Sequence, residues 1–187
     1  GFAPLTIRLM PEEKPTYRIT LERMHLWRVK ATSTGSFESR PLLINNDVYC
    51  VTRNGTIYVL DRNSGATKQT YSIEELTGNK SQVHDVTANS VYSSGLLYIP
   101  SLDGNLYAVD VSKRTLAWHY EVKDFIRSEP VIFDSPKHGK KVIAFGAENG
   151  NLYCLSADKG ELLWSTQTKG PVLSSPVYES GFIYLDR

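Results

Sequence analysis

The sequence predicts an all-β propeller of four-stranded antiparallel blades, and three repeated features carry this prediction. Asn-Gly or Asp-Gly followed by an alternating strand occurs three times, with Gly55, Gly104 and Gly150 spaced 49 and 46 residues apart. An apolar run precedes each hairpin, and Trp118 and Trp164, 46 residues apart, end two later strands. Four short strands in a period of about 40–50 residues are typical of a propeller blade, because its apolar faces are covered only when blades stack.

Each repeat is interpreted as strands A to D in chain order. Strand A begins near a Ser-x-Pro motif or its variant, at Pro41, Ser90, Pro130 and Pro176. Strand B is the apolar run, and strand C carries a Tyr four residues after the Asn or Asp, at Tyr58, Tyr107 and Tyr153. Strand D ends at the Trp, in whose place the first repeat has Tyr71. We expect type I′ turns at the three hairpins, because Asn-Gly and Asp-Gly tolerate positive φ at both central residues.

Two local signals refine this pattern. A short oxygen side chain closes strand C in each repeat, at Asp61, Asp110 and Ser156, where it can cap the next turn. A short helix is expected only after Ser72, because Ser-x-x-Glu resembles a capping box.

The repeats predict the following organisation of the chain. Residues 24–187 form the propeller blades, with complete units at about 38–73, 86–122 and 126–168 and partial blades at both ends; residues 1–23 are the tail of a preceding domain or an edge strand. The segment around Trp27 reads as a lone strand D, and the last 16 residues read as strands A and B of a further blade. Because propellers close with about 4–8 blades, we expect an incomplete arc of a larger ring, whose open faces more chain or another copy would cover. The alternative is a four-bladed ring in which the lone N-terminal strand D completes the last blade.

Composition excludes several function classes. The net charge of +1 gives no reason to expect a nucleic-acid partner, and no apolar run approaches the roughly 20 residues of a transmembrane segment. The four His residues lack metal-ligand spacing, and no nucleophile elbow or phosphate loop is present. We therefore predict no catalytic, cofactor-binding or metal-binding residue, and we expect that the segment is not an enzyme.

The motif order Gly-x-x-x-Ser-x-Pro, strand, Asn/Asp-Gly-x-Leu-Tyr, then Gly-x-x-x-Trp resembles the quinoprotein-type (PQQ-like) repeat, most closely from Glu148 to Tyr178. The family includes quinone-dependent dehydrogenases, outer-membrane assembly scaffolds, lumenal sensor domains and propellers appended to hydrolases. Its dehydrogenases bind PQQ and calcium beside an adjacent pair of cysteines, whereas Cys50 and Cys154 lie in different repeats. The resemblance thus implies a non-catalytic binding or scaffolding module in a periplasmic, lumenal or extracellular protein. The alternatives are an oxidoreductase fragment, a sensor that dimerises, or a propeller appended to a hydrolase.

A possible partner face is formed by the segments that enter strand A, because these loops converge near the axis of a propeller. They contribute Arg40, Asp85, Arg127 and Glu129, together with Phe37 and Phe125. A mixed aromatic and charged lining suits a protein or peptide partner. Because Trp27, Trp118 and Trp164 stand at equivalent positions of the repeat, we predict structural roles for them. We therefore expect Trp164→Ala to lower the melting temperature and Arg127→Ala or Glu129→Ala to leave it nearly unchanged.

Overall fold

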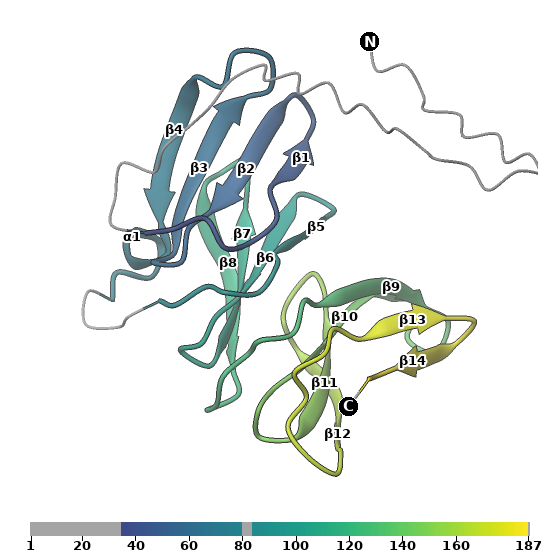
Figure 1. The fold of residues 1–187 in the computed structure, drawn as a ribbon. Helices are drawn as coiled ribbons and strands as arrows, with labels where there is room; N and C mark the ends of the chain where they lie inside the picture. Colours follow the sequence, from purple (N-terminus) through teal and green to yellow (C-terminus); the bar gives the residue numbers. More distant parts are fainter. Residues whose placement is uncertain (1–34, 80–83, 187) are drawn as a thin grey trace, which may run out of the picture.

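The computed structural model describes residues 35–79 and 84–186 of the 187-residue chain. The interpretations of residues 1–23 and of the lone strand D with Trp27 lie outside these residues. Three four-stranded sheets and one two-stranded sheet follow one another along the chain, so the all-β propeller fold is confirmed (Figure 1).

Every sheet is antiparallel, and its strands lie side by side in chain order. Blade 1 contains β1 (Leu42–Ile44), β2 (Asp47–Val51), β3 (Thr56–Asp61) and β4 (Thr67–Ser72). Blade 2 contains β5 (Val91–Ser93), β6 (Leu96–Pro100), β7 (Asn105–Asp110) and β8 (Thr115–Glu121). Blade 3 contains β9 (Val131–Ser135), β10 (Lys140–Gly146), β11 (Asn151–Ser156) and β12 (Leu162–Gln167). The fourth sheet contains β13 (Val177–Glu179) and β14 (Phe182–Tyr184).

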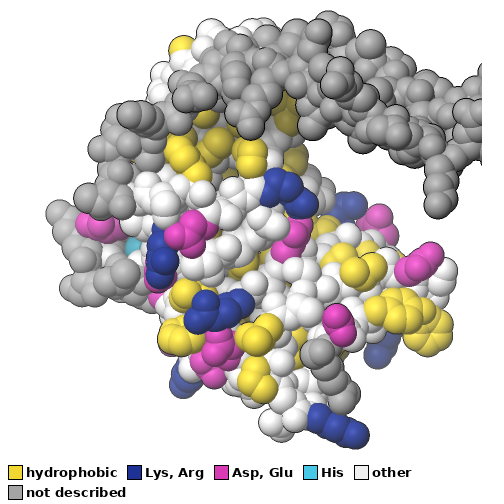
Figure 2. All heavy atoms as spheres, viewed as in Figure 1, with side chains coloured by type: hydrophobic (Ala, Val, Ile, Leu, Met, Phe, Trp, Pro, Cys, Tyr) yellow, Lys and Arg dark blue, Asp and Glu magenta, His cyan; other side chains and the backbone are white. Residues whose placement is uncertain are grey.

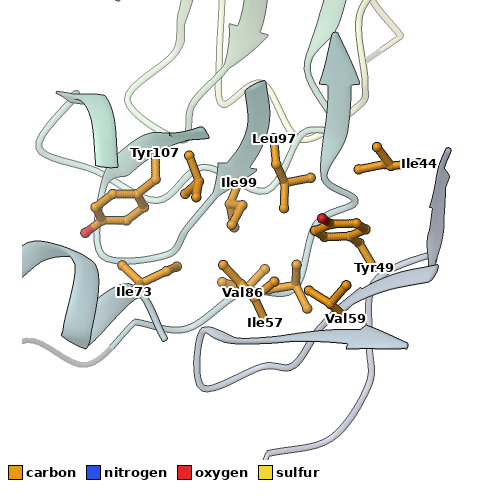
Figure 3. Packing of buried hydrophobic residues seen from close by; sticks show 11 residues of the cluster. Ile44, Tyr49, Ile57, Val59, Ile73, Val86, Leu97, Ile99 and Tyr107 are labelled. Atoms are coloured by element: carbon orange, nitrogen blue, oxygen red, sulfur yellow. The ribbon is translucent and has the colours of Figure 1, made fainter. Parts of the chain in front are cut away.

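The blades stack through apolar side chains and form an open arc. Strand β1 contacts β5, and β9 contacts β13, so the first strands of the sheets lie on the inner side of the arc (Figure 1). Ile57 and Val59 of blade 1 pack on Leu97 and Ile99 of blade 2, and all four side chains are almost fully buried (Figure 3). A comparable cluster fills the seam between blades 2 and 3. The cluster between blade 3 and the fourth sheet is smaller, with Val142, Ala144 and Cys154 as its buried members.

The hairpins between strands B and C are not type I′ turns. Gly55, Gly104 and Gly150 have φ of 76°, 86° and 78°, but the preceding Asn or Asp does not have positive φ. In the first hairpin, Gly55 N donates to Thr52 O at 2.9 Å and Thr52 N donates to Thr56 O at 2.9 Å. This is the pattern of a three-residue loop in which only the final residue is left-handed, which is why Gly is needed there.

The two capping predictions are confirmed. Helix α1 (Ile73–Thr77) follows β4, and Ser72 Oγ accepts a hydrogen bond from Glu75 N while the Glu75 side chain accepts one from Ser72 N. Asp61 Oδ1 accepts from Ser64 N at 2.9 Å, and Asp110 Oδ1 accepts from Lys113 N at 2.9 Å, so both carboxylates cap the turn into strand D.

The prediction that Tyr71 takes the place of the Trp in the first repeat is wrong, as the pairing of the fourth strands shows. Trp118 pairs with Ala108 and Trp164 pairs with Cys154, each beside a β-bulge at the same place in strand C. In blade 1 the corresponding partner, Val59, pairs with Gln69, whereas Tyr71 pairs with Ile57 two residues away. Strand side chains on one face recur every second residue, so Tyr71 lies on the expected face but matches Tyr120 of blade 2.

Trp118 joins blade 2 to blade 3. Its Nε1 donates to Ala157 O at 3.1 Å, and Tyr98 Oη donates to the same carbonyl at 3.0 Å. The indole lies against Gly160 in the turn between β11 and β12, where an added Cβ would come within 2.5 Å of the ring.

Candidate functional site: the strand A entry face

One face of the arc is built from the same backbone contact, repeated in three blades. The residue two before each hairpin glycine donates its N–H to the segment that enters strand A: Arg53 to Ser36 O at 2.8 Å, Leu102 to Asp85 O at 2.8 Å, and Glu148 to Phe125 O at 3.0 Å. We call the surface made by these entry segments and hairpins the entry face. Each of the three blades therefore presents one entry segment and one hairpin to this face.

The residues directly before Pro41, Ser90, Pro130 and Pro176 form a polar network that crosses the arc. Arg40 N donates to Asn89 Oδ1 at 2.7 Å, and Asn89 Nδ2 donates to Glu129 Oε2 at 3.0 Å. The other carboxylate oxygen of Glu129 accepts from Arg40 Nη2 at 2.5 Å, and Glu129 N donates to Ser175 Oγ at 3.0 Å. Four blades thus meet through one residue each at the entry to strand A.

The Ser of each Ser-x-Pro motif explains why that network is held in place. Ser39 Oγ donates to Val51 O at 3.0 Å, Ser128 Oγ donates to Gly146 O at 3.0 Å, and Ser174 Oγ donates to Asp186 O at 2.6 Å. In each case a hydroxyl ties the segment that enters strand A to the end of strand B or to the residues just after it. The repeated Ser is therefore structural, and the residue after it is left to face the neighbouring blades.

The four predicted face residues form two different kinds of contact. The structure brings Arg40 and Glu129 together, although they are 89 residues apart in sequence. Asp85 instead accepts two hydrogen bonds from Arg53, at 2.6 and 2.9 Å, and Arg127 pairs with Glu148. These hydrogen bonds from Arg53 lower the pKa of Asp85, so it stays ionised at neutral pH.

Sequence reasoning missed Arg53, Asn89 and Glu148 because each is an unremarkable residue in a hairpin or entry segment. The available signal was position: Arg53 and Glu148 occupy the same place in two hairpins, and Asn89 stands where the other repeats carry Arg40 and Glu129. Figure 2 shows cations and anions interspersed on the visible face rather than gathered by sign. Cross-blade pairing of this kind leaves little net charge for an ionic ligand.

Apolar side chains remain exposed between these ion pairs. Phe37, Phe125 and Leu173, all in entry segments, are 39%, 44% and 55% exposed. The Arg127 guanidinium carbon lies 5.5 Å from the centre of the Phe125 ring, within range of a cation–π contact. The face therefore offers apolar anchoring points flanked by charges that are already neutralised.

A buried polar cluster lies beneath the hairpin of blade 2. Asp103 Oδ2 is 2.7 Å from both His84 Nδ1 and Tyr107 Oη, and the side chains of His84 and Asp103 are 2% and 4% exposed. Burial opposes ionisation of Asp103, but hydrogen bonds from His84, Tyr107 and Asn105 outweigh it, so the pKa of Asp103 is lowered. The recurring Tyr is thus hydrogen-bonded to the hairpin residue four positions earlier. The same pair occurs in blade 3, where Asn149 Nδ2 donates to Tyr153 Oη at 2.7 Å.

The described residues include no cluster of side chains that suits a metal ion. Within 35–79 and 84–186, no group of three or more His, Cys, Asp or Glu side chains is placed to hold a metal ion. The carboxylates of Asp85, Glu129 and Glu148 on the entry face are engaged by arginines, so their oxygens are not a free donor set. Cys50 and Cys154 are free thiols in β2 and β11 of different blades.

Comparison with known proteins agrees with this architecture. The family model described as outer membrane protein assembly factor BamB matches residues 24–130 and 132–187. BamB from Moraxella catarrhalis is similar in structure, with a TM-score of 0.59 and 15% identity over 75% of this chain and 39% of that protein. The computationally designed Ika4 protein has a TM-score of 0.65 and 13% identity over 87% of this chain and 91% of its own.

A redox enzyme is also similar in fold. Quinohemoprotein alcohol dehydrogenase ADHIIG from Pseudomonas putida HK5 has a TM-score of 0.57 and 20% identity, over 74% of this chain and 22% of the enzyme. This chain therefore spans about two fifths of BamB and about a fifth of the dehydrogenase. A search of curated protein sequences gave no significant match. Within the part of the chain that is described, no helix is long and apolar enough to cross a membrane.

Proposed function

Because this chain belongs to the PQQ-like propeller family described as outer membrane protein assembly factor BamB, we propose that it is a non-catalytic module that binds a protein or peptide. The observation that carries the proposal is the entry face, where Phe37, Phe125 and Leu173 are exposed beside internally paired charges. Aromatic and Arg side chains are enriched at protein interfaces, whereas unpaired cations would be needed for a nucleic acid.

The chemistry of the same face argues against catalysis. Its carboxylates are held by arginines, and the His84–Asp103 pair, which resembles part of a catalytic relay, is almost completely buried. A general base must come within hydrogen-bond reach of its substrate, and a side chain 2% exposed does not. We therefore propose no PQQ, calcium or other cofactor for this segment.

We also propose an extracytoplasmic location, periplasmic, lumenal or extracellular, because the matching family is named for outer-membrane assembly. Fractionation of the native host with an antibody to this chain tests the location. Recovery of the chain with the cytoplasmic fraction would contradict it.

The binding proposal is tested by crosslinking in the native host. A photoreactive residue placed at Phe125 on the entry face should crosslink a discrete protein partner, and the same residue at Leu43, which is 55% exposed on β1, is the matched control. Phe37→Ala combined with Leu173→Ala should abolish the Phe125 crosslink while leaving the melting temperature unchanged. Crosslinks from Leu43 alone, or none from Phe125, would contradict the proposal. Dye-linked alcohol oxidation by the chain after addition of PQQ and calcium would favour the oxidoreductase alternative.

A further inference from the structure

In two of the three hairpins on the entry face, the side chain before the glycine closes the loop. Asp103 Oδ1 accepts a hydrogen bond from Asn105 N at 2.9 Å in blade 2. Asn149 Oδ1 accepts one from Asn151 N at 3.0 Å in blade 3. In both blades the donor is the residue that follows the glycine, so this hydrogen bond ties together the two ends of the turn.

In blade 1 a threonine takes over this role from Asn54. Thr52 Oγ1 accepts from Thr56 N at 3.1 Å, and the same hydroxyl donates to Asn54 Oδ1 at 2.6 Å. The residue at the same place in blade 3 is Ala147, which has no hydroxyl. The carboxamide of Asn54 is therefore not needed to close its hairpin, whereas that of Asn149 is part of the loop.

The amide nitrogens of the two asparagines differ in the same way. Asn149 is half-buried, and its Nδ2 donates to Tyr153 Oη at 2.7 Å and to Val122 O at 3.0 Å. Asn54 is exposed, and its Nδ2 has no hydrogen bond within residues 35–79 and 84–186. The sequence has two Asn-Gly pairs, and only one of them has a carboxamide that is fixed through both of its polar atoms.

This difference has a chemical consequence. Asparagine is thermally labile, above all before glycine, because glycine has no Cβ to hinder the approach of its nitrogen to the carboxamide. The nitrogen of Gly55, after losing its proton, attacks Asn54 Cγ, and the new C–N bond closes a succinimide ring. The bond from Cγ to Nδ2 breaks and ammonia leaves, after which water opens the ring to aspartate or isoaspartate. We propose that Asn54 is a site of spontaneous deamidation in the folded protein and that the fold protects Asn149.

The attacking nitrogens do not distinguish the two loops. Gly55 N donates to Thr52 O at 2.9 Å, and Gly150 N donates to Ala147 O at 3.1 Å. Both loops must therefore open locally before the ring forms. Asn149 must in addition leave the hydrogen bonds of its amide nitrogen, which opposes the rearrangement at this residue alone.

Deamidation of Asn54 adds a negative charge to the entry face. The aspartate form fits the loop, since blade 2 has Asp103 at this position. The isoaspartate form adds a carbon atom to the main chain next to Gly55, where a Cβ would already lie 3.0 Å from the His84 side chain and 3.2 Å from Ile73. We therefore expect the aspartate form to keep the fold and the isoaspartate form to loosen the contact between blades 1 and 2. The inference does not depend on the proposed function.

The inference is tested by ageing the purified full chain at mildly alkaline pH and mapping the products by peptide mass spectrometry. Deamidation should be at least about fivefold faster at Asn54 than at Asn149, because the two hydrogen bonds of Nδ2 must be broken only at Asn149. In concentrated urea, where neither hairpin exists, the two sites should react at similar rates. The inference is overturned if Asn54 stays intact in the folded chain, or if the folded chain reacts equally fast at both sites.

Two variants exchange the arrangements of the two blades. Thr52→Ala, which copies blade 3, should return the Asn54 carboxamide to its loop and slow deamidation there. Tyr153→Phe removes a hydrogen bond of Asn149 and should accelerate deamidation at Asn149 while leaving the rate at Asn54 unchanged. Each rate is divided by the rate of the same variant in urea, so a variant that does not fold is recognised by a ratio of one at both sites. If both variants fold and neither changes its ratio, the carboxamide contacts do not control the reaction and the inference is overturned.

Discussion

The indole of Trp118 lies so close to Gly160 of the next blade that a Cβ at position 160 would sit 2.5 Å from Cε3 of the ring. The corresponding turn of blade 2 carries Arg114, also with positive φ. Strand β4 of the preceding blade, blade 1, has Gln69 at the position of the Trp. The turn conformation alone therefore accepts a side chain, and Gly160 is needed because of the Trp that it faces.

Gly160→Ala is expected to destabilise the fold by about 2–5 kcal/mol. The left-handed backbone costs roughly 1–2 kcal/mol for a residue with a Cβ, and overpacking against the indole adds about 1–3 kcal/mol. Urea unfolding measures the change. Gly139→Ala is the matched control, because Gly139 has φ of 60° and nothing within 4 Å of an added Cβ. Equal losses for the two variants would show that the Trp118 contact has no energetic weight.

Trp118→Ala should lower stability more than Trp164→Ala. Trp118 is covered by the next blade and hydrogen-bonded to Ala157, so its loss is expected to cost about 3 kcal/mol or more. Trp164 borders an open cavity and loses fewer contacts on truncation. Thermal unfolding followed by circular dichroism gives the order. A larger loss for Trp164→Ala would mean that the cavity is filled in solution.

The Arg40–Glu129 pair should contribute little to stability and should be sensitive to salt. Its side chains are 58% and 23% exposed, and pairs of this kind contribute about 1 kcal/mol or less. A double-mutant cycle with Arg40→Met and Glu129→Gln should give a small coupling free energy at low salt. This coupling free energy should be smaller still in 1 M salt, where the Debye length is about 3 Å. A coupling independent of salt would argue that the pair acts through packing instead of charge.

Asp103→Asn should flatten the acid side of the stability curve. The pKa of Asp103 is lower in the folded state than in the unfolded chain, so its stabilising effect is full above the unfolded value of about 3.9 and is lost as pH falls through the folded value. Urea titrations at pH 7, 5 and 3 should therefore show a smaller acid-induced loss for the variant. The exposed Asp158→Asn is the control and should keep the wild-type slope. If Asp103→Asn lost as much stability as the wild type between pH 7 and pH 3, the lowered pKa of Asp103 would be contradicted.

The repeat unit was readable from sequence because each of its signals is local. Alternation gives the strands, the left-handed glycines give the hairpins, and Ser72 with Glu75 gives the helix cap, and each depends on residues within a few positions. Two details failed. The type I′ assignment failed because the loop is one residue longer than the Asn-Gly pair suggests, and Tyr71 was misplaced by two residues because alternation does not fix register along a strand.

The sequence by itself determined the class of fold, the order of strands in each blade and the set of side chains near the entry face. Only the tertiary structure decided their partners: Arg40 meets Glu129 across 89 residues, Asp85 is held by Arg53, and Asp103 is buried with His84. The physical reason is that a strand pattern specifies contacts within a blade, whereas the stacking and twist of successive blades specify which loops meet. Pairing between blades is therefore not encoded in any single repeat.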